Sequence, residues 1–237
     1  RWAQSLKLPS DRVTWFNFLA SHDGIGINPA RGILSDTEIE ALVARTLAHG
    51  GFVSYKRNPD GSESPYELNI NFLDALSNPA ASEPVEVAAK KFLTAQAIML
   101  SLQGVPGIYF HSLFGSRGDR AGAEASGINR RINRQKLSRA TLESDLNHPA
   151  SLRARVFNGY RELLTLRRAH SAFAPNAPQR VLELEPRVFA VLRENADGGD
   201  RVLCLHNVGA HPVHVAAEAA GFPPCILKPF ETRWTTA

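Results

Sequence analysis

Apolar and polar stretches alternate along the first half of the chain in the order of a parallel α/β fold. Residues 13–20, VTWFNFLA, form a nearly continuous apolar run, which is typical of a parallel strand buried on both faces. Residues 85–102 predict a mostly apolar helix, and residues 108–110 predict a second short strand. Polar side chains follow each strand, with His22 and Asp23 after the first and His111 after the second. This order predicts a parallel sheet with polar groups at its carboxyl edge.

Capping and turn residues set the limits of the elements between those strands. Ser35 and Glu38 have the spacing of a capping box ahead of a helix that runs to Gly50 and Gly51. A long polar segment, residues 55–68, follows, and its Asn-Pro-Asp-Gly sequence at 58–61 predicts a turn.

The second half of the chain changes character twice. Residues 115–138 are rich in glycine, arginine and asparagine and predict a long loop, whereas residues 151–168 predict an amphipathic helix. After Pro175, short β-like runs alternate with turn residues, which predicts an antiparallel β module. We therefore expect a first domain over residues 1–172 and an all-β domain over residues 173–237.

Composition excludes several classes of protein. The chain is 43% hydrophobic and 21% charged, which is ordinary for a globular protein. Its apolar stretches are too polar and too interrupted for a membrane span. A net charge of +4 comes largely from two arginine clusters without interleaved aromatic residues, so we expect no nucleic-acid partner. Only Cys204 and Cys225 are present, and the amino terminus has no apolar signal core; both features favour reduced thiols and a cytoplasmic location.

Several separate motifs resemble a known enzyme family. The segment FLASHDGIGI (18–27) resembles the motif that ends the seventh barrel strand of α-amylase-superfamily enzymes, glycoside hydrolase family 13. Residues 50–69, 104–116 and 127–138 together resemble the sucrose phosphorylase subgroup, and VLCLHNV and LKPFETRW resemble its closing β domain. The resemblance implies the carboxyl-terminal part of a (β/α)8 TIM barrel, from about strand 7 onward, followed by a small antiparallel β domain.

The same resemblance implies a retaining α-glucoside phosphorylase, which transfers a glucosyl group to phosphate and releases α-glucose 1-phosphate. It implies no metal or organic cofactor. The nucleophile and the acid/base of the family end the fourth and fifth barrel strands, so we expect this chain to be a fragment without them. Its expected partners are a glucoside, inorganic phosphate and the rest of the barrel, and we expect order only with that remainder or through self-association. A hydrolase or transglucosylase on the same fold, or a non-catalytic sugar-binding or assembly module, are the alternatives.

Three residues carry the glucosyl-binding roles that the resemblance implies. Asp23 corresponds to the third carboxylate of the family, which stabilises the transition state by accepting hydrogen bonds from the 2- and 3-hydroxyls of the glucosyl ring. His22 would donate to a neighbouring hydroxyl, and Arg134 corresponds to the arginine that holds the 4-hydroxyl. Arg130 and Arg131 are weaker candidates.

Further candidates concern the acceptor. Tyr66, Glu67 and Asn69 correspond to the loop that shapes the acceptor side, but Tyr-Glu-Leu-Asn replaces the Tyr-Gln-Val-Asn of sucrose phosphorylases. Sucrose, sucrose 6'-phosphate and glucosylglycerate therefore stay open as substrates. An anionic acceptor would need extra basic groups, and four lie in suitable predicted loops: Lys56, Arg57, Arg117 and Arg120. His111 would line the same mouth or have a structural role.

Overall fold

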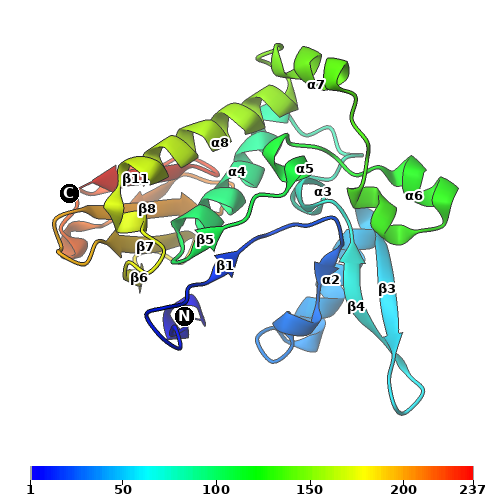
Figure 1. Cartoon of the computed structure of the whole chain (residues 1–237), viewed down its shortest axis with the longest axis horizontal. Helices are drawn as coiled ribbons and strands as arrows, with labels where there is room; N and C mark the ends of the chain where they lie inside the picture. Colours follow the sequence, from blue (N-terminus) through cyan, green and yellow to red (C-terminus); the bar gives the residue numbers. More distant parts are fainter. Residues whose placement is uncertain (1, 237) are drawn as a thin grey trace. The chain divides into compact units, whose positions relative to one another are not determined.

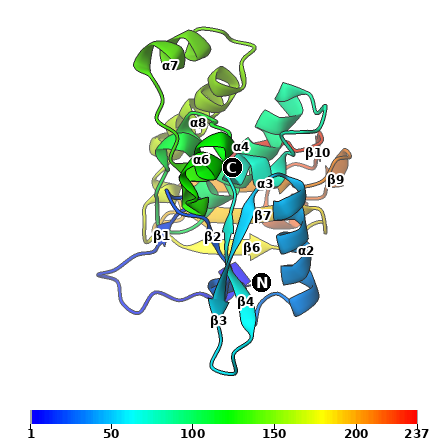
Figure 2. The ribbon, with the colours of Figure 1, turned by 90° about the vertical axis from the view of Figure 1, so that its right-hand side faces the viewer.

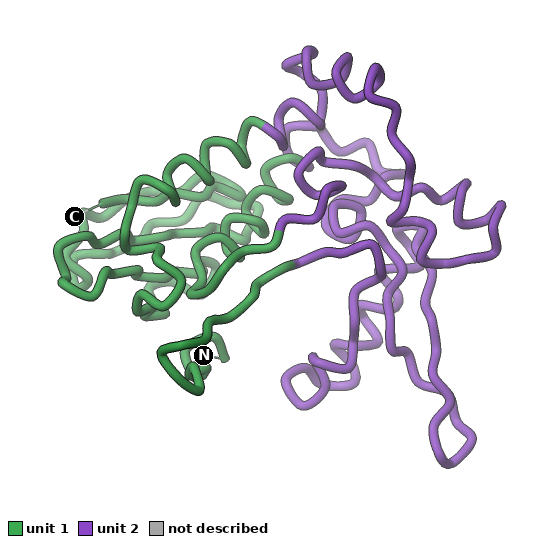
Figure 3. Tube along the Cα trace, in the orientation of Figure 1, with its two compact units in different colours: residues 1–18, 89–107, 158–237 green, residues 19–88, 108–157 purple. Residues whose placement is uncertain are grey.

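A computed structural model of the chain describes residues 2–236. It contains two compact units, shown in different colours in Figure 3. Unit 1 comprises residues 1–18, 89–107 and 158–237, and unit 2 comprises residues 19–88 and 108–157. Helices α4 (Val85–Ser101) and α8 (Leu152–Ala169) each begin in unit 2 and continue into unit 1. Both helices match the ranges predicted for them.

Unit 2 is built around a three-stranded antiparallel sheet and one long helix. The strand order is β2 (Ile25–Gly26), β4 (Glu63–Asn69), β3 (Phe52–Arg57). Helix α2 (Asp36–Ala48) runs beside these strands (Figure 2), and its Ile39 and Val43 pack on apolar side chains of the sheet. The predicted capping box starts α2: Glu38 N donates to Ser35 Oγ (3.3 Å) and Ser35 N donates to Glu38 Oε2 (2.8 Å).

The polar segment at residues 55–68 forms most of a β-hairpin, visible as the long β3–β4 arm in Figure 1. The predicted turn closes it: Asn58 N donates to Ser62 O at 2.8 Å, and Gly61 has φ +84°. Tyr66, Glu67 and Asn69 therefore lie on β4 and not in a loop. The expectation of a loop there is wrong, because main-chain pairing with β3 and β2 holds the segment in extended conformation.

The predicted loop at residues 115–138 also contains regular structure. It forms helix α6 (Arg120–Ser126) and the 3₁₀-helix η2 (Asn129–Asn133). Asp119 starts α6 by accepting from Gly122 N at 3.0 Å, and Gly127 ends it with φ +65°. The remaining helical segments of unit 2 are η1 (Asn28–Ala30), α3 (Phe72–Leu76), α5 (Phe110–Leu113) and α7 (Arg139–Leu146).

Unit 1 contains one short parallel pair of strands, which matches the predicted strands only in part. Strand β1 (Phe16–Asn17) lies parallel to β5 (Val105–Pro106). The expected strand at 108–110 is wrong, since Gly107 N already makes the last pairing bond, to Asn17 O, and Phe110 begins α5. Burial on both faces of the first strand is also wrong: Phe16 is 67% exposed.

The β module of unit 1 is antiparallel, as predicted. Its main sheet has the order β11 (Thr232–Thr236), β8 (Arg201–Asn207), β7 (Val188–Glu194), β6 (Gln179–Leu182). Strands β9 (Val213–Val215) and β10 (Cys225–Leu227) form a second pair, whose Val213, Val215 and Leu227 pack against one face of that sheet. Cys204 and Cys225 are free thiols, as expected. The short segments α1 (Trp2–Ser5), η3 (Ser171–Phe173) and η4 (Glu218–Ala220) complete the unit.

The predicted boundary near residue 173 falls within unit 1, at η3, and stays a prediction. Arg193, on β7, is fully buried and donates to the main-chain carbonyls of Ser101 (3.0 Å) and Ala177 (3.2 Å). These bonds tie the sheet to the end of α4 within unit 1. In residues 2–236, the helices fall short of the length and hydropathy that crossing a membrane demands.

The buried His206 predicts acid sensitivity of unit 1. It lies on β8 with Nδ1 3.2 Å from Thr232 Oγ1, and burial lowers its pKa to about 3. The unfolded chain takes up a proton near pH 6.5, so stability is lost as the pH falls from about 6.5 towards 3, by at most about 1.4 kcal/mol per pH unit. Urea unfolding at several pH values should show a shallower loss in His206→Leu. His214→Leu, at an exposed position of β9, is the control. If the free energy of unfolding falls equally steeply with pH in both variants, this account is contradicted.

Candidate functional site

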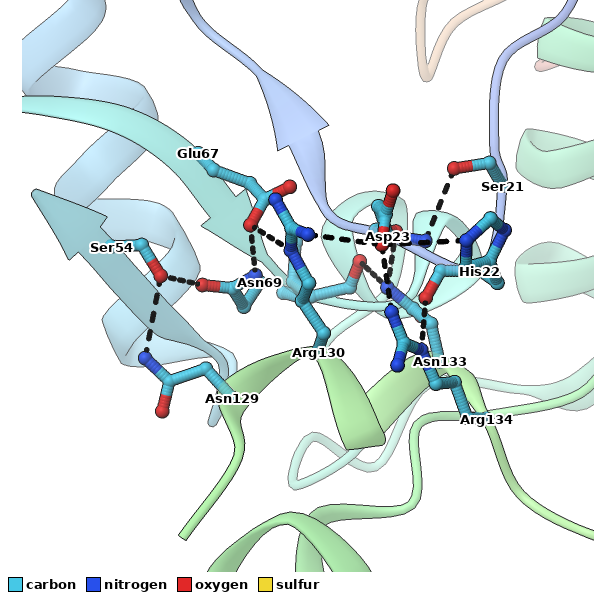
Figure 4. A network of polar contacts seen from close by, with 11 residues as sticks. Ser21, His22, Asp23, Ser54, Glu67, Asn69, Asn129, Arg130, Asn133 and Arg134 are labelled. Carbon is cyan, nitrogen blue, oxygen red and sulfur yellow. Dashed lines mark hydrogen bonds and ion pairs between the residues drawn. The ribbon is translucent and has the colours of Figure 1, made fainter.

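Asp23 lies in the segment that leads into β2, and its carboxylate faces a cluster of polar side chains (Figure 4). Its amide N donates to Ser21 Oγ at 3.1 Å, which fixes the turn of the chain after the apolar run. The side chain is 32% exposed, so the carboxylate lies at the surface of unit 2 and can reach a ligand. The binding role of Asp23 stays a prediction.

Two arginines and a histidine surround one oxygen of this carboxylate. Arg134 Nη2 donates to Asp23 Oδ1 at 2.8 Å, and Arg130 Nη1 lies 3.5 Å from the same atom. His22 Nε2 is 3.6 Å from Oδ1, and Arg134 Nε also donates to the His22 carbonyl at 3.0 Å. Within residues 2–236 the recorded partners of the carboxylate all meet Oδ1, and Oδ2 faces away from them in Figure 4. The predicted trio of His22, Asp23 and Arg134 is therefore brought together.

Glu67 is the second carboxylate of the cluster, and it is 5% exposed. Its Oε2 accepts from Arg130 Nε at 2.9 Å and from Asn69 Nδ2 at 2.8 Å. Asn69 Oδ1 in turn accepts from Ser54 Oγ at 2.6 Å, across the β3–β4 pair. The hydrogen bond to Glu67, with the attraction of its charge, raises the pKa of Arg130. Arg130 thus bridges Glu67 and Asp23, which the sequence did not indicate.

The main chain of the site is held by Asn133, at the end of η2. Its Nδ2 donates to the Asp23 carbonyl at 2.9 Å and to the Ile70 carbonyl at 3.3 Å. The Asn133 carbonyl accepts from Tyr109 Oη at 2.6 Å. Because Asn133 directly precedes Arg134, these bonds fix the position from which the Arg134 guanidinium reaches Asp23.

Gly24 permits the close approach of the Asp23 segment to β4. A Cβ at this position would lie 2.5 Å from the Leu68 carbonyl oxygen and 2.7 Å from Glu67 Cγ. No side chain fits at those distances without displacing the strand. Glycine is needed here for space and not for a left-handed backbone.

His111, the second residue of α5, is buried and contacts side chains outside the Asp23 cluster. Its Nδ1 lies 2.9 Å from Ser116 Oγ, which also accepts from Arg153 Nη1 at 2.8 Å. Burial lowers the pKa of His111. These contacts favour the structural alternative for His111, and a substrate contact stays a prediction. For Tyr66, which is half-buried beside Glu67 on β4, the acceptor role likewise stays a prediction.

Two of the four basic residues considered for an anionic acceptor have structural partners. Arg117 donates to Asp74 Oδ1 and to the Ser77 carbonyl, both at 2.8 Å. Arg120 pairs with Glu124 at 2.9 Å and lies over the Phe52 ring. Lys56 and Arg57 are exposed at the outer end of β3.

Sequence reasoning missed or undervalued four members of the site: Gly24, Tyr109, Arg130 and Asn133. Arg130 and Asn133 lie three residues apart in INRRINR, and a 3₁₀-helix places such residues on one side. That spacing was a usable signal only if the helix itself had been predicted.

The close approach at Gly24 predicts a position-specific loss of stability. Gly24→Ala should destabilise unit 2 by about 1–3 kcal/mol, because the new methyl group overlaps Leu68 and Glu67. Gly26→Ala, two residues along in β2, meets only Pro29 Cδ at 3.9 Å and should change stability by less than about 0.5 kcal/mol. Urea unfolding of both variants measures the difference, and equal stabilities would show that the approach is looser than described.

Comparisons with known proteins show which proteins this chain is similar to. No family model matches the chain. The glucosylglycerate phosphorylase of Allomeiothermus silvanus is 48% identical over 238 residues, which cover 98% of this chain and 42% of that protein. The glucosylglycerate phosphorylase of Escherichia coli K12 is 46% identical, over 90% of this chain and 38% of its own length. The sucrose 6(F)-phosphate phosphorylase of Ilumatobacter coccineus is 32% identical, over 73% and 32%. The chain thus spans about two fifths of the length of the first two relatives.

Solved structures show the fold. The sucrose 6F-phosphate phosphorylase of Thermoanaerobacter thermosaccharolyticum matches with a TM-score of 0.66 at 18% identity, over 81% of this chain and 36% of that one. The cyclic α-maltosyl-(1→6)-maltose hydrolase of Arthrobacter globiformis matches with a TM-score of 0.50 at 15% identity, over 93% and 34%. The chain has the fold of the carboxyl-terminal part of a (β/α)8 barrel with a small antiparallel β domain. By these relatives and its motifs, the chain belongs to the sucrose phosphorylase-like subgroup of the α-amylase superfamily.

Proposed function

We propose that the full-length protein is a retaining α-glucoside phosphorylase and that glucosylglycerate is its substrate. One observation carries the proposal: Asp23, half-exposed and held by Arg134, lies in a chain that is 46–49% identical to three glucosylglycerate phosphorylases. Relatives named for sucrose 6(F)-phosphate and for sucrose are 32% and 24% identical. This difference in identity favours glucosylglycerate over the other substrates left open by the sequence.

In this proposal Asp23 acts on the glucosyl ring and not on the bond that breaks. Its free oxygen accepts hydrogen bonds from ring hydroxyls, and these bonds strengthen as positive charge develops at the anomeric carbon. Arg134 holds the carboxylate in place and offers a donor to a hydroxyl on the same side. His22, 65% exposed beside Asp23, supplies a further donor.

The covalent steps use groups that lie outside this chain. A carboxylate nucleophile attacks the anomeric carbon and expels glycerate, which takes a proton from an acid/base residue. A phosphate oxygen then attacks the same carbon and gives its proton to the acid/base residue. The ester bond to the enzyme breaks, its electron pair returns to the nucleophile, and α-glucose 1-phosphate leaves. The contribution of this chain is the recognition of the glucosyl ring and of the acceptor.

The remainder of the barrel is the proposed partner of this chain. Phe16 is 67% exposed and Phe18 is 55% exposed, both on or beside β1 in unit 1. Strand β1 pairs only with β5 among the described residues, so one of its edges is free for a neighbouring strand. A barrel closed by further strands would cover these side chains and pair that edge.

The test is an assay of the full-length protein with glucosylglycerate, with and without inorganic phosphate. Formation of glucose 1-phosphate that depends on phosphate is the expected result. Dominant release of free glucose would instead identify a hydrolase, and no reaction with any α-glucoside would favour a sugar-binding module.

Replacement of the carboxylate tests the role of Asp23. Asp23→Asn should lower kcat/KM by about 10²–10⁴-fold, because a neutral amide cannot stabilise the developing charge and an amide group replaces one acceptor oxygen. Circular dichroism and urea unfolding check that the variant folds. A loss below about fivefold in a folded variant would remove Asp23 from the proposed site.

A further inference from the structure

The two arginines at Asp23 differ in how many hydrogen bonds they donate within the cluster. Arg134 makes two hydrogen bonds within the cluster, to Asp23 Oδ1 (2.8 Å) and to the His22 carbonyl (3.0 Å). Arg130 makes one, from Nε to Glu67 (2.9 Å), while its Nη1 stays 3.5 Å from Asp23, beyond the usual hydrogen-bond range. A guanidinium has five N–H donors. Among residues 2–236, most N–H donors of Arg130 therefore lack a hydrogen-bond partner, and its side chain is 40% exposed.

Glu67 explains why Arg130 does not close onto Asp23. The carboxylate of Glu67 is buried, so its charge needs a partner, and Arg130 supplies it. Asn69, two residues farther along β4, donates to the same oxygen of Glu67, and Ser54 donates to Asn69. The bond to Glu67 thus holds the guanidinium by its Nε edge and turns its terminal nitrogens towards Asp23.

We propose that Arg130 binds the anionic group of the acceptor, the carboxylate of glycerate and phosphate in turn, and that Glu67 is the positioning residue for Arg130. This inference rests on the proposed function. Figure 4 shows Arg130 between Glu67 and Asp23, with Arg134 on the side of His22. An anion at Arg130 would therefore lie next to the glucosyl ring held by Asp23.

The chemistry of a retaining phosphorylase makes one cation serve both anions. The leaving glycerate and the incoming phosphate bond to the anomeric carbon on the same face, one after the other. They therefore occupy the same space, and a guanidinium placed there contacts each in its turn. Arginine suits this task because its fork of donors matches both carboxylate and phosphate oxygens.

The other basic residues near the site are less suited to the role. Arg117 and Arg120 are engaged by Asp74, Ser77 and Glu124. In the strand register, Arg57 lies opposite Glu63 and Lys56 lies opposite Ser64, whereas Glu67 lies opposite Ser54. Lys56 and Arg57 thus lie two and three residues farther along β3 towards the turn.

The experiment compares an anionic with a neutral acceptor at the same donor. The full-length protein transfers glucose from glucose 1-phosphate to glycerate or to glycerol, and the ratio of the two kcat/KM values is measured. Arg130→Met should lower the glycerate-to-glycerol ratio by about 10–100-fold, the loss typical of a charge-assisted hydrogen bond. Because both reactions use one donor, a weaker hold on glucose 1-phosphate cancels in the ratio.

Arg131→Met is the matched control. Arg131 is the adjacent residue of η2, equally basic and 39% exposed, but its Nε faces Asp119 at 3.8 Å. The ratio measured for Arg131→Met should stay within about twofold of the parent protein, since the substitution removes the same charge from a side chain that is directed at Asp119. If glycerol transfer is too slow to measure, the KM for phosphate in phosphorolysis replaces the ratio: it should rise at least about fivefold in Arg130→Met and not in Arg131→Met.

Variants of Glu67 test its positioning role. Glu67→Gln keeps an oxygen for Arg130 Nε and should retain most of the preference for glycerate, whereas Glu67→Leu should lose it as Arg130→Met does. An unchanged ratio in Arg130→Met, or equal losses with glycerate and glycerol, would overturn the inference, since Arg130 would then act on the glucosyl side or not at all. A parent protein that forms no glucose 1-phosphate from any α-glucoside would instead refute the proposed function.

Discussion

Two carboxylates that share one guanidinium are the constraint on which this site depends. Removing Glu67, and in part Asp23, from water costs free energy that only opposite charge and hydrogen bonds can offset. Arg130 serves Glu67 directly and Asp23 at longer range, while Arg134 completes the neutralisation of Asp23. Each carboxylate keeps its orientation because donors fixed elsewhere hold it. A sugar or an anion that enters therefore meets groups that are already in place.

Orientation of the side chains requires that three distant segments lie close together. Residues 21–24, strand β4 and the 3₁₀-helix η2 supply the site. The Asn133 side-chain amide joins them by donating to the main-chain carbonyls of Asp23 and of Ile70, the residue after β4. The absence of a side chain at Gly24 sets the spacing between the first two. Tyr109 then holds the end of η2 through the Asn133 carbonyl. Packing and main-chain bonds thus determine where the charges lie, and the charges determine what the site binds.

Local patterns predicted the elements whose signals are local. The capping box of α2, the turn at residues 58–61 and both long helices lie where Ser35, Asn58 and the apolar periodicity indicate. The errors fell where tertiary contacts decide. The polar segment at 55–68 pairs as a hairpin, and the two parallel strands contract to pairs of residues set by bonds such as Gly107 N to Asn17 O.

The site residues also divide into those that local motifs predict and those that only tertiary contacts reveal. Asp23, His22 and Arg134 were predicted from motifs that surround them, whereas Arg130 gained its importance from Glu67, 63 residues away and unpredictable as its partner. The burial expected on both faces of the first strand is not seen for a related reason, because the described residues supply only β5 as a neighbour of β1. Phe16 is apolar like a core residue, yet it is exposed in unit 1.

The helical form of η2 has a consequence for how such a site can change. In a 3₁₀-helix each residue stands directly above the third one before it, so Arg130 and Asn133 share a side, and the intervening Arg131 points to Asp119 instead. Adding or deleting a single residue between positions 130 and 133 would rotate one of them out of the site while leaving the composition of the segment nearly unchanged. The spacing within this short stretch is therefore less free to vary than the identity of the residues between its two contacts.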